Sequence, residues 1–218
     1  MPTIVQKRGP FTSSGTASVG SGDGWTTPTS GNLLFFLVAS TNVTIGNVTG
    51  FTRSTAIDIT YQTSKRFCLF TKTSVGTEST ISSTLGGSDN WAVCALEISN
   101  HTGIRAEMSE ESNSAATEFG PTDGTPVAGD LSIGIQGFLF NTVTEGSGWT
   151  GLIPTGLSNM YWGSNFGIMI GIETRTSLGG AETATFTLSD SHGAAGACVV
   201  IAAGEPPFVP AKIIFQAP

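Results

Sequence analysis

Hydrophobic residues occur along this chain in short runs separated by turn residues, and they do not repeat with the 3.6-residue period of an amphipathic helix. Eight runs rich in β-branched and aromatic residues are bounded by Gly, Asn, Asp, Ser or Pro, which predicts strands. These runs cover residues 33–40, 67–73, 79–85, 91–99, 131–137, 166–176, 181–188 and 195–203. Residues 102–116 carry too few apolar positions for a helix, and we interpret them as a loop or an edge strand.

Short strands joined by turns are typical of an all-β fold, and we expect a jelly-roll-like antiparallel β-sandwich. Residues 33–38 are apolar at every position. Because side chains alternate between the two faces of a strand, this strand should be covered on both sides.

An internal repeat is the most informative feature of the sequence. Residues 28–33 match residues 126–131 at an offset of 98, and both read as a Pro-x-x-Gly turn that leads into a strand. Further matches follow in the same order: 51–52 with 149–150, 72–76 with 175–179 at an offset of 103, and 92–94 with 196–198 at 104. The last match aligns Cys94 with Cys198. The second copy gains about six residues, mostly between 150 and 176, which predicts an enlarged loop.

The repeat predicts one sandwich of two pseudo-repeated halves within residues 1–204, the halves being about 12–100 and 101–204. Two separate domains would also fit the repeat. No Pro-rich or charged linker separates the copies, which favours the single sandwich.

Composition and charge exclude several functions. Only 11% of the 218 residues are charged, against about 25% in an average domain. The net charge is −7, and Lys and Arg never cluster beyond a pair, which argues against nucleic acid as a partner. The longest apolar runs have seven residues, too few for a membrane helix. The first ten residues lack the apolar core of a secretory signal, so we expect synthesis in a cytoplasm.

No catalytic, metal or cofactor site emerges from the spacing of reactive residues. The three cysteines lack zinc-ligand spacing and are expected to be small buried residues, with a disulfide between Cys94 and Cys198 left open. The two histidines, His101 and His192, lie in turn-like segments, and no Gly-x-Ser-x-Gly elbow is present. The carboxylates between 107 and 123 read as a solvated face, and residues 20–24 read as a turn. We expect a protein that is not an enzyme and holds no cofactor or metal.

Two segments are candidates for contact with other molecules. Tyr161 and Trp162 lie in the enlarged polar loop, where aromatic rings could stack on a glycan or a protein partner, or could cover the end of the core. The C-terminal residues 205–218 contain three prolines that disfavour a central strand. They are also too apolar to be left in water, at Phe208, Val209, Ile213, Ile214 and Phe215. We expect an extended arm that lies on a neighbouring copy, although docking onto its own domain is also open.

The order of these elements resembles a family of tailed-bacteriophage virion proteins. The residues that carry it are the Pro-x-x-Gly-Asn-Leu-Leu strand start, Phe51-Thr52, Phe70-Thr71-Lys72-Thr73 and the run from Trp91 to Ser99. The resemblance covers roughly residues 12–203 and brings no catalytic residues with it. It implies a homo-oligomeric structural component of a virion, in contact with other virion proteins, most simply a minor tail protein that mediates assembly or host-surface contact. A capsid decoration protein and a carbohydrate-binding adhesin that recognises a host glycan are the alternatives.

Overall fold

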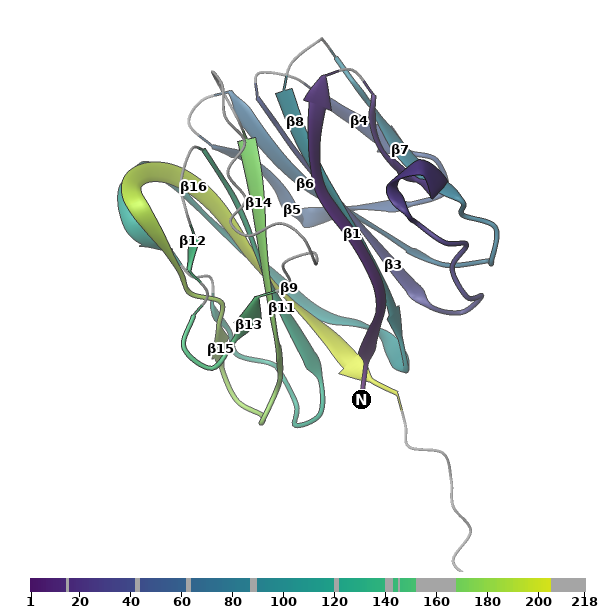
Figure 1. Cartoon of the computed structure of the whole chain (residues 1–218). Coiled ribbons are helices and arrows are strands. Elements are labelled where there is room, and N and C mark those ends of the chain that lie inside the picture. The colour runs from purple at the N-terminus through teal and green to yellow at the C-terminus, as the bar shows by residue number, and fades with distance from the viewer. Residues whose placement is uncertain are drawn as a thin grey trace, which may run out of the picture.

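The computed structural model shows two antiparallel β-sheets packed face to face, which confirms the predicted all-β sandwich (Figure 1). It describes residues 1–14, 16–41, 44–61, 64–86, 90–119, 122–139, 143–144, 146–151 and 168–204. Within these residues the single helical element is a 3-10 turn, η1 (Ser21–Asp23). No helix in the described ranges is long and apolar enough to cross a membrane.

The first sheet has the strand order β1-β8-β3-β6-β5. Its members are β1 (Thr3–Ser14), β8 (Asn90–Ser99), β3 (Leu33–Thr41), β6 (Lys65–Thr73) and β5 (Thr52–Tyr61). All nine residues of the central strand β3 are buried, which confirms the expectation that it is covered on both faces.

The second sheet contains β16 (Phe186–Ala203), β11 (Leu131–Leu139), β14 (Ile168–Thr176) and β13 (Thr150–Gly151) in that order. On its other side, β16 pairs with β9 (His101–Phe119) and with β12 (Val143–Thr144). Residues 102–116 therefore belong to an edge strand, which was one of the two predictions for this segment, and not to a loop. The two strands predicted at 181–188 and 195–203 are mainly one long strand, because β16 runs without a break through Gly193 and Gly196.

Two smaller sheets lie outside the sandwich. A three-stranded sheet, β2-β7-β4, covers the outer face of the first sheet; its strands are β2 (Ala17–Gly20), β7 (Thr80–Leu85) and β4 (Ile45–Val48). A two-stranded ribbon pairs β10 (Thr122–Asp123) with β15 (Glu182–Thr183).

The two halves repeat the same topology. The order β9-β16-β11-β14-β13 in the second half corresponds to β1-β8-β3-β6-β5 in the first. The registers correspond too: Leu33 pairs with Thr73 and Ile98, as Leu131 pairs with Thr176 and Ile201. In this correspondence β1 is the counterpart of β9.

The alignment of Cys94 with Cys198 is wrong by one residue. Cys94 pairs with Leu37, and the counterpart of this pair in the second half is Ala197 with Ile135. Because adjacent residues of a strand face opposite ways, Cys94 lies in the core between the sheets and Cys198 lies on the outer face. All three cysteines are free, so the disulfide left open by the sequence does not form.

Both halves share one core. The inner faces contribute large apolar residues from each sheet, among them Phe35, Leu37, Phe67, Leu69 and Leu96 from the first and Ile133, Ile135, Ile170, Val199 and Ile201 from the second. At one side of the sandwich β5 packs on β9, and at the other β1 packs on β14. Each half thus places its first strand against the other sheet: β9 lies on the edge strand β5, and β1 lies on β14, next to the short edge strand β13.

Candidate functional site

Equivalent turns in the two halves lead into β3 and β11, beside the C-terminal ends of β8 and β16. In the first half, residues 28–32 lie beside residues 74–76. Gly31 N donates to Ser74 O at 2.9 Å, and Ser74 N donates to Asn32 O at 2.8 Å. These bonds hold the start of β3 next to the end of β6.

The second half builds the same pair of turns from residues 126–130 and 177–179. Gly129 N donates to Ser177 O and Ser177 N donates to Asp130 O, both at 2.9 Å. The matches found in the sequence therefore correspond to matching hydrogen bonds in the structure.

The glycines of these turns explain why the two motifs recur. Gly31, Gly76, Gly129 and Gly179 have φ values of 89°, 82°, 92° and 90°, a left-handed region that other residues rarely adopt. Val75 precedes Gly76 and Leu178 precedes Gly179, and each lies at the exposed tip of its turn.

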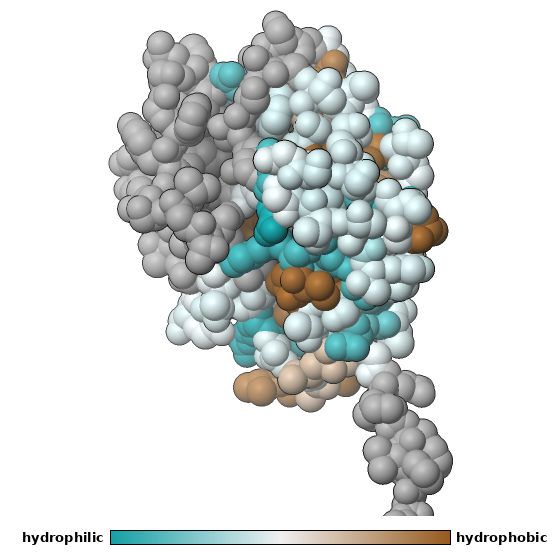
Figure 2. Space-filling model, turned by 45° about the vertical axis from the view of Figure 1, so that its right-hand side comes forward, coloured by the Kyte–Doolittle hydropathy of each residue, from teal (hydrophilic) through white to brown (hydrophobic). Residues whose placement is uncertain are grey.

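The tips of the turns are apolar and exposed. Leu178 and its counterpart Val75 are 81% and 61% exposed, and Val127 in the facing turn is 51% exposed. Met1, 68% exposed, comes close to the same turn, since a Cβ on Gly129 would lie 4.0 Å from its Cγ. We call the surface formed by Met1, Val127 and Leu178 the end face, because the turns that carry Val127 and Leu178 are bonded to each other and Met1 lies beside them. Hydrophobic residues colour the lower end of the molecule in Figure 2.

The end face carries no exposed charge in its turns. Within residues 126–130 and 176–181 the single charged residue is Asp130, which is buried. In a chain of net charge −7, such a surface can approach another copy without like-charge repulsion.

The main chain leaves the sandwich between the two pairs of turns. Ala203 N donates to Asp130 Oδ1 at 2.9 Å, next to the second turn. Gly204 N donates to Asn100 O at 2.9 Å, and His101 Nε2 lies 3.2 Å from the carbonyl oxygen of the glycine in the first turn. In Figure 1 strand β16 ends beside the N-terminus at this end.

Different carboxylates hold the two turns in place. In the first half, buried Glu97 accepts hydrogen bonds from Gln6 Nε2 (2.6 Å), Thr29 N (2.8 Å) and Asn32 Nδ2 (2.5 Å). The corresponding position in the second half is Val200, which has no polar group, so a different carboxylate takes over.

That carboxylate is Asp130. It accepts from Arg105 Nε at 2.6 Å and from Val127 N and Ala203 N at 2.9 Å. Burial alone would raise its pKa, but the hydrogen bonds from Arg105 and the two backbone amides hold the pKa of Asp130 below its usual range. Asp130 stays ionised and ties the end of β16 to the second turn.

Corresponding ion pairs link β6 and β14 to the segments that follow them in the chain. Lys72 Nζ lies 2.7 Å from Glu78, and Arg175 Nε lies 3.0 Å from Glu182. Burial would raise the pKa of Glu78, but Lys72 and neighbouring donors hold it well below its ordinary value.

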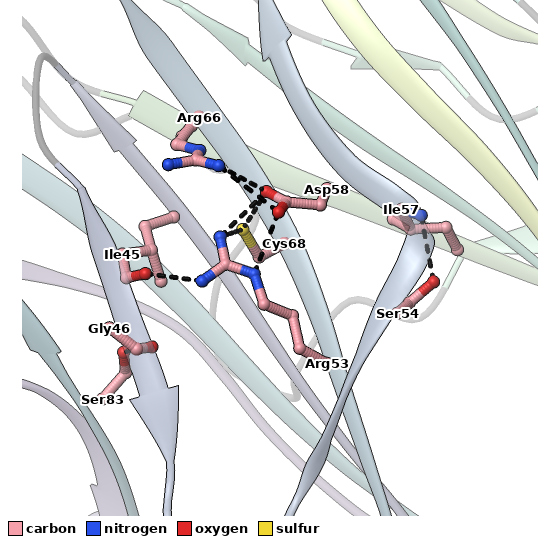
Figure 3. A network of polar contacts seen from close by, with 9 residues as sticks. All are labelled: Ile45, Gly46, Arg53, Ser54, Ile57, Asp58, Arg66, Cys68 and Ser83. Carbon is pink, nitrogen blue, oxygen red and sulfur yellow. Dashed lines mark hydrogen bonds and ion pairs between the residues drawn. The ribbon is translucent and has the colours of Figure 1, made fainter.

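A second polar cluster lies where β5 bulges against β6 (Figure 3). Asp58 forms ion pairs with Arg53 at 2.9 Å and with Arg66 at 3.1 Å, and accepts from Cys68 Sγ at 3.0 Å. Arg53 Nη1 also donates to Ile45 O at 2.7 Å. The cluster bonds β4, β5 and β6 together, and Asp58 is shared between two guanidinium groups, which makes it a structural crosslink.

None of the thiols has the low pKa that a nucleophile needs. Burial raises the pKa of Cys68, Cys94 and Cys198 to about 12 in each case. No three His, Cys, Asp or Glu side chains in the described part of the chain lie where they could hold a metal ion.

The outer face of the second sheet is polar where that of the first is apolar. In corresponding positions, Trp25, Leu34, Phe36, Val38 and Phe70 are replaced by Asp123, Ser132, Gly134, Gln136 and Glu173. The small apolar cluster on this face consists of Trp149, Ala184, Phe186 and Cys198.

Gln136 is the least satisfied of these polar residues. Its side chain is fully buried, and neither amide atom has a hydrogen-bond partner among the described residues. The residues beside it on the neighbouring strands are Gly171 and Gly196, which offer no side chain. An amide buried in this way costs free energy unless a partner reaches it.

The residues singled out in the sequence meet different outcomes. Tyr161, Trp162 and the arm residues Phe208, Val209, Ile213, Ile214 and Phe215 lie outside the described residues. His101 lies on the border of the end face. Sequence reasoning missed Val75 and Leu178 as surface residues, although the signal was present as an apolar residue at the matched turn position of both copies.

Comparison of the chain with protein-family models, with curated proteins and with solved structures finds no match of any kind.

Proposed function

We propose that this chain is a structural component of a bacteriophage particle, most simply a minor tail protein that acts as a homo-oligomer. The observation that carries the proposal is the end face. Of the six large hydrophobic residues in the described part of the chain that are about half exposed or more, three lie together there, next to the point where the chain leaves the sandwich. Apolar surface gathered in this way is characteristic of association sites.

The rest of the molecule suits an assembly role. The shared core and the covering sheet give a rigid body, and each half builds the same pair of turns. A structural protein needs a stable scaffold and a surface that fits its neighbours.

Fractionated particles of the phage that encodes the chain test this proposal. Mass spectrometry of separated heads and tails should find the protein in the tail fraction in several copies. Recovery from the head fraction would favour the capsid decoration alternative instead. Absence from both fractions would overturn the proposal.

The polar outer face of the second half favours one further candidate, a carbohydrate-binding adhesin. A buried amide and carboxylates near the aromatic Trp149 are groups that bind sugar hydroxyls and ring faces. The segment with Tyr161 and Trp162 follows Gly151, whose backbone pairs with Glu173 on this face. Binding to a glycan array that is lost in Trp162→Ala would support the adhesin, and an array without any signal would exclude it.

A further inference from the structure

We propose that the end face binds the C-terminal arm, residues 205–218, of a second copy of this chain. This inference rests on the proposed role as a homo-oligomeric structural protein and names the partner that the end face takes. Three features of the chain lead to it: where the arm begins, what it is made of, and what surrounds its starting point.

The arm begins next to the surface that it would bind on another copy. Ala203 is held to the second turn through Asp130, and Gly204 is held to the residue before β9. When two copies meet by their end faces, each arm therefore starts close to the face of the other. Such an exchange is reciprocal and forms a closed pair.

The composition of the arm favours a neighbouring copy over its own domain. The arm begins Glu-Pro-Pro, and these prolines, with Pro210, favour an extended backbone and oppose the tight reversal needed for folding back at once. Fourteen extended residues can span up to about 46 Å. The apolar residues begin only at Phe208, which gives the arm the length to reach a neighbouring copy.

The end face and the arm are chemically complementary. The arm offers Phe208, Val209, Ile213, Ile214 and Phe215, and the face offers Met1, Val127 and Leu178. Its turns carry no exposed charge that would have to be desolvated, and the arm has one acid, Glu205, and one base, Lys212. Burial of apolar side chains is the main source of affinity for such a pair.

The first test measures mass and secondary structure together. Light scattering should show an oligomer for the full chain and a monomer for the chain truncated after Gly204, with the β signal in circular dichroism unchanged. The double variant Val127→Ser/Leu178→Ser should dissociate roughly tenfold or more readily than the parent. The control is Met108→Ser, which changes an exposed hydrophobic residue of β9 away from the end face and should leave the mass unchanged.

The second test uses a synthetic peptide of residues 205–218. It should bind the truncated chain, and binding should weaken roughly tenfold or more in the truncated Val127→Ser/Leu178→Ser variant. A scrambled peptide is the control and should not bind.

Each other outcome overturns the inference in a distinct way. A full chain that is monomeric while the peptide binds means that the arm docks on its own domain. An oligomer that survives truncation means that another surface associates, and loss of the β signal on truncation means that the arm belongs to the fold. Association in solution by a protein absent from purified particles would uphold the arm contact and reject the proposed virion role.

Discussion

At the scale of single residues, the two halves reach the same turn geometry by different polar contacts. The first turn depends on Glu97, which receives three hydrogen bonds, and the second depends on Asp130, which receives bonds from Arg105 and from two backbone amides. In both cases a buried carboxylate remains favourable because its oxygens are satisfied by donors. The backbone of the turn is repeated, whereas the residues that hold it are not.

Replacement of Asp130 should destabilise the protein and change its response to acid. Asp130→Asn removes a buried charge that Arg105 and the end of β16 depend on, and we expect a loss of about 3 kcal/mol in unfolding free energy at pH 7. The folded-state pKa of Asp130 is lowered, so its stabilisation is present above the unfolded pKa, about 3.9, and is lost as the pH falls through the folded value.

Urea unfolding from pH 7 down to pH 2 measures this effect. The parent should lose stability in acid more steeply than Asp130→Asn, because the variant lacks the group that must be protonated. Glu110→Gln, an exposed position on β9, is the control and should follow the parent. Parallel curves for parent and Asp130→Asn would contradict the assignment.

The three thiols should be unreactive in the folded protein. All three are buried, and burial raises the pKa of Cys68, Cys94 and Cys198 to about 12, so almost no thiolate exists at pH 8. A thiol reagent such as an aromatic disulfide should modify none of them in buffer and all three in guanidinium chloride. Fast modification of any thiol in the native state would show that its strand opens readily.

At the scale of elements, the clearest difference between the halves is on the outer faces of β3 and β11. The face of β3 packs large apolar side chains against the three-stranded covering sheet. The corresponding face of β11 has Ser132, Gly134 and Gln136, which pack much less apolar volume. Since the backbone registers are the same, this difference comes from side chains alone.

Replacement of Gln136 by valine, the residue at the corresponding position of the first half, should stabilise the protein. Gln136→Val removes a buried amide without a partner in the described part of the chain and places the counterpart of Val38, and we expect a gain of about 1–2 kcal/mol. Thermal unfolding measures the change. A loss of stability would show that Gln136 has a partner and is required by the fold.

A substitution at the nearby Gly134 should have the opposite effect on stability. A Cβ on Gly134 would lie 2.8 Å from Ala184 Cβ and 2.8 Å from Glu173 Cγ, so Gly134→Ala should destabilise by about 1–3 kcal/mol. If both variants shift stability the same way, the packing of this face differs from the described one.

At the scale of the whole molecule, the central feature is a core shared by both halves. The inner faces of the two sheets form one apolar cluster, and neither half covers its inner face alone. The arrangement is that of a symmetric dimer joined into one chain.

The shared core predicts that the halves unfold together. Differential scanning calorimetry should show a single transition whose calorimetric and van't Hoff enthalpies agree. A destabilising change in either half, Asp58→Ala in the first or Gly134→Ala in the second, should shift the whole transition. Two resolved transitions would mean two independent domains.

The sequence by itself determined the fold class, most of the strands and the repeat. Apolar runs between turn residues identify strands because side chains alternate along them, and the Pro-x-x-Gly and Ser-x-Gly turns recur because their glycines need positive φ. Weakly apolar strands were missed, notably β1 and β5, because their burial is partial and their pairing is broken by bulges. The break in β1 includes Gly9, which has a φ of 91°.

Only the tertiary structure decided the register and the surface. Cys94 and Cys198 look equivalent in the sequence, but a shift of one residue places them on opposite faces, and hydrogen bonding to β3 and β11 fixes that shift. Val127 and Leu178 look like ordinary apolar residues until the pairing of β11 with β14 brings their two turns side by side. Exposure and proximity depend on contacts between residues far apart in the chain, which local sequence patterns do not contain.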